Sequence, residues 1–228
     1  MKKSSNKKHM VYFEMLDAFR TARTCPLCFL EERDAHRYME NLLYEKVNSV
    51  ALRGKLIRSR GFCRRHAHML LEFGNGLGTA ILYRDQVRAF LDFLKDRTKP
   101  TARITKRTIP ESWSHDSLCP ACTALAQMRE VYLDTFLEWI NDDNFRTALE
   151  QSNGLCVPHL LLILRKTKDP SLQKYLILKH IEKYSTLLTE LNEYIRKTDY
   201  QYKHEKRGKE KDAWKRAVSL LAGGENSL

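Results

Sequence analysis

Apolar residues recur every three or four positions along most of the chain, the spacing that places them on one face of an α-helix. This pattern predicts helices over residues 9–22 and 29–47, and a long helix that opens after Pro170 and extends from Leu172 to about Lys203. No segment shows the polar–apolar alternation of a half-buried β-strand. The sequence therefore predicts an all-α protein, a helical bundle.

The same spacing indicates which faces are buried. In the helix over 29–47 this face comprises Tyr38, Leu42, Leu43 and Val47, and in the long helix it comprises Tyr175, Ile181, Tyr184, Leu188, Leu191 and Ile195. Residues 206–209 predict a basic turn, which a short amphipathic helix follows. We expect the apolar face of this last helix, formed by Trp214, Val218 and Leu221, to dock on the rest of the protein.

The second half of the chain repeats the first. Shifted by 94 positions, Tyr38 coincides with Tyr132; shifted by 93, the segment LRGKLIRSRGFCRRH coincides with FRTALEQSNGLCVPH. Two such copies are expected to fold as pseudo-symmetric halves that share a core. We therefore expect one compact unit with four parts: a first repeat (1–97), a linker (98–117), a second repeat (118–205), and a basic turn with a C-terminal helix (206–228).

Two short motifs, each present twice, contain all six cysteines. The motifs CPLC (Cys25–Cys28) and CPAC (Cys119–Cys122) are followed, about 35 residues on, by GFCRRH and GLCVPH. In the first turn of a helix, residues three apart lie on one face, and a proline at the first helical position loses no hydrogen bond. Each motif can therefore present two donors to one ion, and two motifs supply the four donors of tetrahedral zinc.

We assign one metal ion to each repeat. The first site would comprise Cys25, Cys28, Cys63 and His66, and the second Cys119, Cys122, Cys156 and His159; pairing across the repeats is the alternative. Closed Cys3His sets are typical of structural zinc, which predicts two zinc ions per chain. An iron–sulfur cluster with one His ligand is the main alternative, and redox-active dithiols or disulfides are the third. Four protein donors disfavour hydrolytic chemistry at zinc, which needs an open position.

The surroundings of the two predicted sites differ. Cations flank the third and fourth ligands of the first site in RSRGFCRRHAH, whereas the residues after His159 are apolar from Leu160 to Leu164. A helix that is apolar on every side is normally buried. The first site is therefore expected near the surface and the second in the core.

The chain is basic, with 40 Lys and Arg, 28 Asp and Glu, and a formal net charge of +12. This charge favours an anionic partner, such as nucleic acid or another anionic macromolecule, although a solvated basic face explains it equally well. One basic cluster, without an acidic residue, comprises Arg53, Lys55, Arg58, Arg60, Arg64 and Arg65. A second, around the linker, comprises Lys95, Arg97, Lys99, Arg103, Lys106 and Arg107.

The remaining features carry less chemistry. No run approaches the roughly 20 apolar residues of a membrane span, and no signal-peptide segment is recognisable, so we expect a cytoplasmic protein with reduced thiols. The segment GNGLGT (Gly74–Thr79) lacks the preceding strand of a phosphate-binding loop, which favours a turn between helices. His36, His68 and His180 are expected to be packing or surface residues. The spacing assigns no catalytic residue.

These motifs and the C-terminal segment resemble an uncharacterised family of bacterial and archaeal proteins. That family combines a duplicated CPxC…GxCxxH pattern with a C-terminal D-Y…E…W-x-R-A segment. The positions that match the C-terminal segment are Asp199, Tyr200, Glu210, Trp214, Arg216 and Ala217. The resemblance implies a helical metal-binding protein and supplies no activity. We thus expect a metal-stabilised scaffold that binds an anionic partner, with an iron–sulfur or thiol-based redox protein as the alternative.

Overall fold

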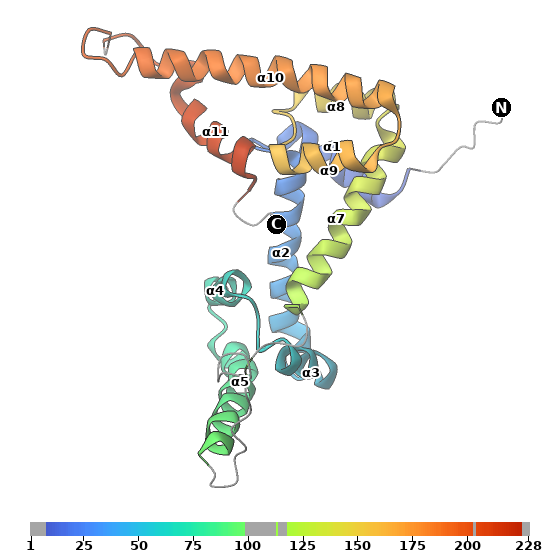
Figure 1. Cartoon of the computed structure of the whole chain (residues 1–228), viewed down its shortest axis with the longest axis vertical. Helices are drawn as coiled ribbons and strands as arrows, with labels where there is room; N and C mark the ends of the chain where they lie inside the picture. Colours follow the sequence, from blue (N-terminus) through green and yellow to red (C-terminus); the bar gives the residue numbers. More distant parts are fainter. Residues whose placement is uncertain (1–7, 99–112, 114–117, 203, 225–228) are drawn as a thin grey trace, which may run out of the picture. The chain divides into compact units, whose positions relative to one another are not determined.

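The computed structural model describes residues 8–98, 113, 118–202 and 204–224, and these residues form helices and turns without a β-strand (Figure 1). The all-α prediction is confirmed. The chain divides into two compact units: unit 1 comprises residues 1–32 and 129–228, and unit 2 comprises residues 33–128. Both boundaries fall inside helices, α2 (Pro26–Asn41) and α7 (Pro120–Trp139). Each unit therefore combines segments of both repeats and does not follow the repeat boundaries.

Unit 1 has an aromatic core. Besides the start of α2 and the end of α7, it contains α1 (Met10–Thr21), α8 (Asp143–Gln151), α9 (Val157–Lys166), α10 (Pro170–Arg196), a 3-10 turn (Lys209–Asp212) and α11 (Ala213–Ala222). The ring of Phe145 packs against Phe19, with centroids 4.9 Å apart, and against Phe136 at 5.9 Å. Because aromatic side chains bury large apolar areas, these contacts hold α1 and α8 together.

Unit 2 has an aliphatic core. It contains the end of α2, a π-helical turn η1 (Leu42–Lys46), α3 (Val50–Arg58), α4 (Arg64–Glu72), α5 (Gly76–Arg97) and the start of α7. Its large, deeply buried side chains include Met39, Leu42, Leu56, Leu70 and Leu82. Both α3 and α4 contact α5. The first two residues of GNGLGT, Gly74 and Asn75, form the predicted turn between α4 and α5, and the other four begin α5. The side chain of Asn75 caps this helix by accepting a hydrogen bond from the Gly78 N–H at 2.8 Å.

The predicted docking face of the C-terminal helix is wrong. Helix α11 packs on α9 and α10, and its contact with α10 is made by Ala213, Ala217 and Leu220. Trp214, Val218 and Leu221 are instead 47%, 63% and 59% exposed. Because Ala213 and Ala217 are small, this face of α11 allows its backbone to approach α10 closely, which the larger side chains of the predicted face would prevent. In α10 as well, Leu176, His180 and Leu187 are buried, whereas Ile181, Leu188 and Ile195 are exposed.

The C-terminal segment shared with the family has a structural role. The buried carboxylate of Glu210 accepts hydrogen bonds from Lys197 Nζ at 2.9 Å and from the Gly208 N–H at 2.8 Å. Arg216 of α11 pairs with Asp212, the last residue of the 3-10 turn, and with Glu190 on α10. These contacts fasten the basic turn and α11 to α10.

The predicted linker, apart from Thr98 and Trp113, lies outside the described residues, as do Lys99, Arg103, Lys106 and Arg107 of the second basic cluster. Among the described helices, none has the length and hydropathy that crossing a membrane requires.

Candidate metal centres

The eight predicted ligands form two groups of four, each within one unit. The buried cluster comprises Cys25, Cys28, Cys156 and His159 of unit 1, and the half-buried cluster comprises Cys63, His66, Cys119 and Cys122 of unit 2. In each group the ligand atoms all lie within 4.8 Å of one another. Each group takes its CPxC motif from one repeat and its GxCxxH motif from the other.

The predicted pairing within each repeat is therefore wrong, and the pairing across repeats is correct. The physical reason is helix length. Each CPxC motif opens a long helix, α2 with 16 residues and α7 with 20. At 1.5 Å per residue these helices are about 24 Å and about 30 Å long. Each helix therefore separates its CPxC motif in space from the GxCxxH motif that follows it in the sequence.

The four motifs start four helices in the same way. Cys25 and Cys119 immediately precede Pro26 and Pro120, the first residues of α2 and α7, and their carbonyls accept the first intrahelical hydrogen bonds at 3.0 Å. Cys63 and Cys156 are the N-cap residues of α4 and α9, and their carbonyls accept hydrogen bonds at 2.8 Å. The second donor of each motif follows three residues later, on the same side of the first turn. Each of the four helix starts thus supplies two donors to one cluster. The free N–H groups at a helix start favour the thiolate form of a nearby cysteine.

A duplicated loop leads into each GxCxxH motif. Gly61 and Gly154 have φ values of +92° and +85°, which residues with a side chain rarely adopt. Two residues before each glycine, the hydroxyl of Ser59 or Ser152 donates to a carbonyl of the preceding helix, that of Leu56 or Leu149. The repeat therefore preserves the loop that positions the third ligand as well as the ligands themselves.

The distances between donors are close to those around a single tetrahedral ion. In the buried cluster, Nδ1 of His159 lies 3.6, 3.4 and 3.1 Å from the sulfurs of Cys25, Cys28 and Cys156, and the last two sulfurs are 3.5 Å apart. Metal–ligand bonds of about 2.3 Å to sulfur and about 2.0 Å to nitrogen, in tetrahedral geometry, place donors roughly 3.5–3.8 Å apart. The separations of 3.1–3.6 Å in the buried cluster lie within or just below this range, so the space between the donors suits a single small ion.

The half-buried cluster has the same dimensions. Nδ1 of His66 lies 3.2, 3.6 and 3.3 Å from the sulfurs of Cys63, Cys119 and Cys122, and the sulfurs of Cys63 and Cys122 are 3.6 Å apart. All six cysteines are free thiols, since a disulfide would bring two sulfurs to about 2.05 Å. Three thiolates and a neutral imidazole around a divalent ion would carry a net charge of −1.

Glu31, which is not among the residues predicted from the sequence, adds a carboxylate behind the buried cluster. Its Oε1 lies 3.2 Å from Nε2 of His159, and the same oxygen accepts a hydrogen bond from Nε of Arg129. A carboxylate on the second nitrogen orients a ligating histidine and makes it a stronger donor. The sequence does contain a signal for it, because Glu31 follows Cys28 by three residues and so lies on the same face of α2.

Among the residues that the structure describes, no carboxylate contacts His66 of the half-buried cluster. The position equivalent to Glu31 in the second repeat is Leu125, a buried core residue. On the other side of His66, Nη2 of Arg65 lies 3.3 Å from Nε2. The two clusters therefore share their donors but not the groups that surround them.

These surroundings move the pKa values of the two histidines in opposite directions. Burial, followed by the charge of Arg65, lowers the pKa of His66 to about 4, which keeps the imidazole neutral as metal binding requires. Burial also acts to lower the pKa of His159, but hydrogen bonds with Cys156, Cys28 and Glu31 outweigh it and raise this pKa to about 11. Without metal, His159 is therefore protonated beside Cys28, whose own pKa is lowered by hydrogen bonds with Cys156 and Cys25, whereas burial raises the pKa of the Cys25 thiol. A metal ion that binds here would displace the protons of His159 and Cys25.

A backbone group from the far end of the chain also reaches the buried cluster. The N–H of Gly224, just after α11, donates to Sγ of Cys28 at 3.1 Å. A hydrogen bond to a thiolate stabilises its charge. Sequence spacing could not have indicated this contact, because 196 residues separate the two groups.

The predicted basic cluster of α3 and α4 is divided by its local contacts. Arg53 forms an ion pair with Asp85 at 2.5 Å, Arg65 contacts His66, and the guanidinium of Arg60 lies 4.2 Å from the centroid of the Trp113 ring. The remaining members, Lys55, Arg58 and Arg64, are exposed. The surface charge available to a partner is therefore smaller than the sequence suggests.

Comparisons with known proteins agree with the resemblance seen in the sequence. A family model described as "Family of unknown function (DUF6062)" matches residues 6–227. An uncharacterised 23.9 kDa protein in the xynA 3′ region of Caldicellulosiruptor sp. (strain Rt8B.4) is 28% identical over 211 residues, which cover 92% of this chain and 99% of that protein. No solved structure matches the chain. Because the family model spans almost the whole sequence, this protein belongs to the family of unknown function DUF6062.

Proposed function

We propose that the protein binds one zinc ion in each cluster, and that the two ions stabilise a helical scaffold whose basic surface binds nucleic acid. The observation that carries the metal assignment is the convergence of four donors, twice, at separations of 3.1–3.6 Å. Three of the four donors in each set are thiols, the ligand type that zinc shares with few other biological metals.

The donor separations favour a single ion over an iron–sulfur cluster. In such a cluster, several iron and sulfide atoms lie between the protein ligands, so only ligands of the same iron atom are close together. Here all four donors of each set lie within 4.8 Å of one another, which leaves room for one ion. The redox alternative is therefore the second candidate.

Elemental analysis of freshly purified, reduced protein tests the assignment directly. We expect two zinc ions per chain and a colourless solution. A brown preparation that absorbs near 400 nm and contains iron and sulfide would replace the proposal with the iron–sulfur alternative. Removal of the metal by a chelator should lower the melting temperature, because binding energy at such sites is also folding energy.

The nucleic-acid part of the proposal is supported by the exposed cations Lys55, Arg58 and Arg64 and by the net charge of +12. Contacts of cations with phosphates release counterions, so affinity should fall steeply with salt. Because such contacts do not read the bases, affinity should depend weakly on sequence. Fluorescence anisotropy with labelled single- and double-stranded oligonucleotides at several salt concentrations measures both properties.

Charge reversal tests the surface. Changing Arg58, Arg60 and Arg64 together to Glu should abolish binding. A matched control changes Arg165, Lys168 and Lys174, which are exposed residues of unit 1, to Glu and alters the net charge equally. Equal losses in the two variants would show that only the total charge matters, and binding that survives the first variant would exclude this surface.

A further inference from the structure

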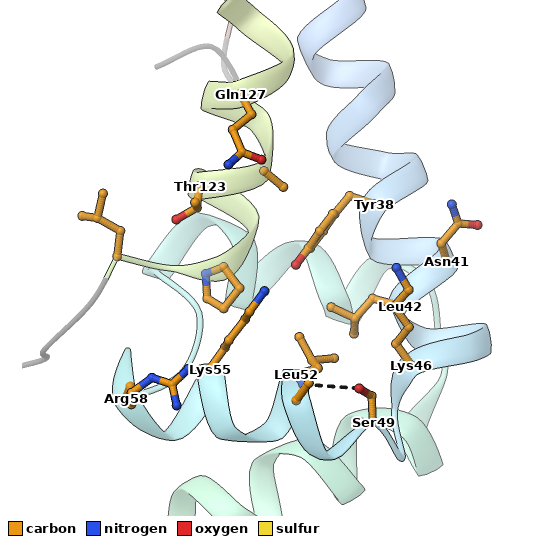
Figure 2. Close-up of a pocket in the computed structure, with 14 residues that line it drawn as sticks. Tyr38, Asn41, Leu42, Lys46, Ser49, Leu52, Lys55, Arg58, Thr123 and Gln127 are labelled. Atoms are coloured by element: carbon orange, nitrogen blue, oxygen red, sulfur yellow. Dashed lines mark hydrogen bonds between the residues drawn. The ribbon is translucent and has the colours of Figure 1, made fainter.

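Unit 2 contains a pocket of about 600 Å³ that the metal centres do not use. Its walls come from the end of α2, the π-helical turn η1, α3 and the start of α7 (Figure 2). Pockets that hold small molecules have volumes of roughly 300–1,000 Å³, so the space is sufficient for a ligand of about mononucleotide size.

The charged residues of the described pocket wall are all cations. They are Lys46, Lys55 and Arg58, and none of the described lining residues is acidic. Lys55 and Arg58 are three residues apart and so share a face of α3, whereas Lys46 comes from η1. Within the described part of the chain, no carboxylate forms an ion pair with any of the three, in contrast to Arg53, which is paired with Asp85. Their charges are therefore available to an anion.

The rest of the lining suits an organic ligand better than a bare ion. Neutral hydrogen-bonding groups of Tyr38, Ser49 and Gln127 lie among apolar side chains such as Leu52 and Pro120. Figure 2 shows the Tyr38 hydroxyl and the Lys55 ammonium pointing toward each other across the pocket. Such a mixture of an apolar wall with a few polar groups is typical of small-molecule sites.

Two features of the backbone give this pocket a defined shape. The turn η1, which carries Leu42 and Lys46, is π-helical, and isolated π-helical turns are rare and occur often at functional sites. On the opposite wall, Pro120 lies between Cys119 and Cys122 of the half-buried cluster. An ion in that cluster would fix the first turn of α7 and with it this side of the pocket.

We infer that this pocket binds a small organic phosphate, with the phosphate held by Lys46, Lys55 and Arg58 and the organic part against Tyr38 and Leu52. The cations supply charge and hydrogen-bond donors to the phosphate oxygens. The inference goes beyond the proposed nucleic-acid surface. It rests on the proposed metal binding only for the rigidity of the Pro120 wall.

Isothermal titration calorimetry with AMP, inorganic pyrophosphate and uncharged adenosine tests the inference, with the zinc content of every preparation measured beside it. AMP and pyrophosphate should bind with Kd values below about 1 mM, and adenosine at least tenfold more weakly. The double variant Lys46→Gln/Lys55→Gln should weaken AMP binding at least tenfold. The control Arg84→Gln/Arg88→Gln removes two exposed cations of α5 outside the pocket and should leave binding unchanged.

A steric variant tests the shape of the pocket separately from its charge. Ala51 is exposed and lines the pocket, so Ala51→Trp should fill part of it while every cation is kept. It should weaken AMP more than pyrophosphate. Oligonucleotides with a 5′-phosphate and with a 5′-hydroxyl test whether the ligand is the end of a nucleic acid. Tighter binding of the 5′-phosphate form would indicate a nucleic-acid end, and equal binding of the two forms would indicate a free small molecule. The inference would be overturned by zinc-loaded protein that binds neither AMP nor pyrophosphate, or by equal losses in the Lys46/Lys55 and Arg84/Arg88 double variants. Weak binding by protein without zinc would instead point to failed metal binding.

Discussion

Oε1 of Glu31 lies 3.2 Å from Nε2 of His159, and both side chains are at most 3% exposed. This contact gives the buried cluster a second layer that the half-buried cluster lacks. We therefore expect the two candidate metal centres to differ in affinity and in their contribution to stability, although their ligands come from a duplicated pattern.

Changing Glu31 to Gln should weaken metal binding at the buried cluster by roughly 10- to 100-fold, because the amide orients His159 without a negative charge. Competition with a colorimetric chelator measures the effect, and one of the two ions should be lost earlier than in the unchanged protein. Glu40→Gln, at an exposed position of the same helix, is the control and should leave both ions in place. Identical release curves for the two variants would show that Glu31 does not support the site.

Loss of a ligand should affect the two clusters unequally. Cys25 is fully buried and all four members of its cluster are buried, whereas Cys63 and Cys122 of the other cluster are partly exposed. Cys25→Ser should therefore destabilise the protein by at least about 4 kcal/mol or prevent folding, and Cys119→Ser by clearly less. The pairing of motifs across repeats reverses the order expected from the sequence, which placed Cys119 in the core site. Parallel thermal melts and metal counts decide the order, and a larger effect of Cys119→Ser would contradict it.

A side chain at Gly154 should strain the loop before Cys156. This residue has φ +85°, and a Cβ atom there would lie 2.6 Å from Cδ of Lys183. Gly154→Ala should lower the free energy of unfolding by about 1–2 kcal/mol from backbone strain, in addition to the displacement of Lys183. Gly76→Ala is the matched control, because a Cβ atom added there would meet no atom within 4 Å and the φ of Gly76 is ordinary. Chemical denaturation measures both variants, and equal stabilities would contradict the prediction.

Acidification should loosen the C-terminal segment through Glu210. Hydrogen bonds from Lys197 and from the Gly208 N–H lower the pKa of this carboxylate from 4.5 to about 2. A lowered pKa stabilises the fold above the ordinary pKa, and this stabilisation is lost as the pH falls from about 4.5 through 2. Glu210→Gln should therefore be less stable than the unchanged protein at pH 7 and should lose less stability over that range. Denaturation curves between pH 7 and 2 test this, with exposed Glu72→Gln as the control.

The sequence determined the parts of this protein that depend on local geometry. The helix class follows from the apolar spacing, and the eight candidate ligands follow from residues three apart in the first turn of a helix. The apolar residues after His159 and the arginines beside His66 also indicated correctly which GxCxxH motif lies in the more buried cluster. Each of these inferences needs only a few consecutive residues.

The tertiary structure alone decided which motifs meet. The lengths of α2 and α7 separate each CPxC motif from the GxCxxH motif that follows it, and no short-range pattern encodes that separation. The same is true of the contact between Gly224 and Cys28, and of the pocket that joins Lys46 and Lys55 to Pro120. The direction and length of whole helices determine these relationships, because packing brings together side chains that are remote in the sequence.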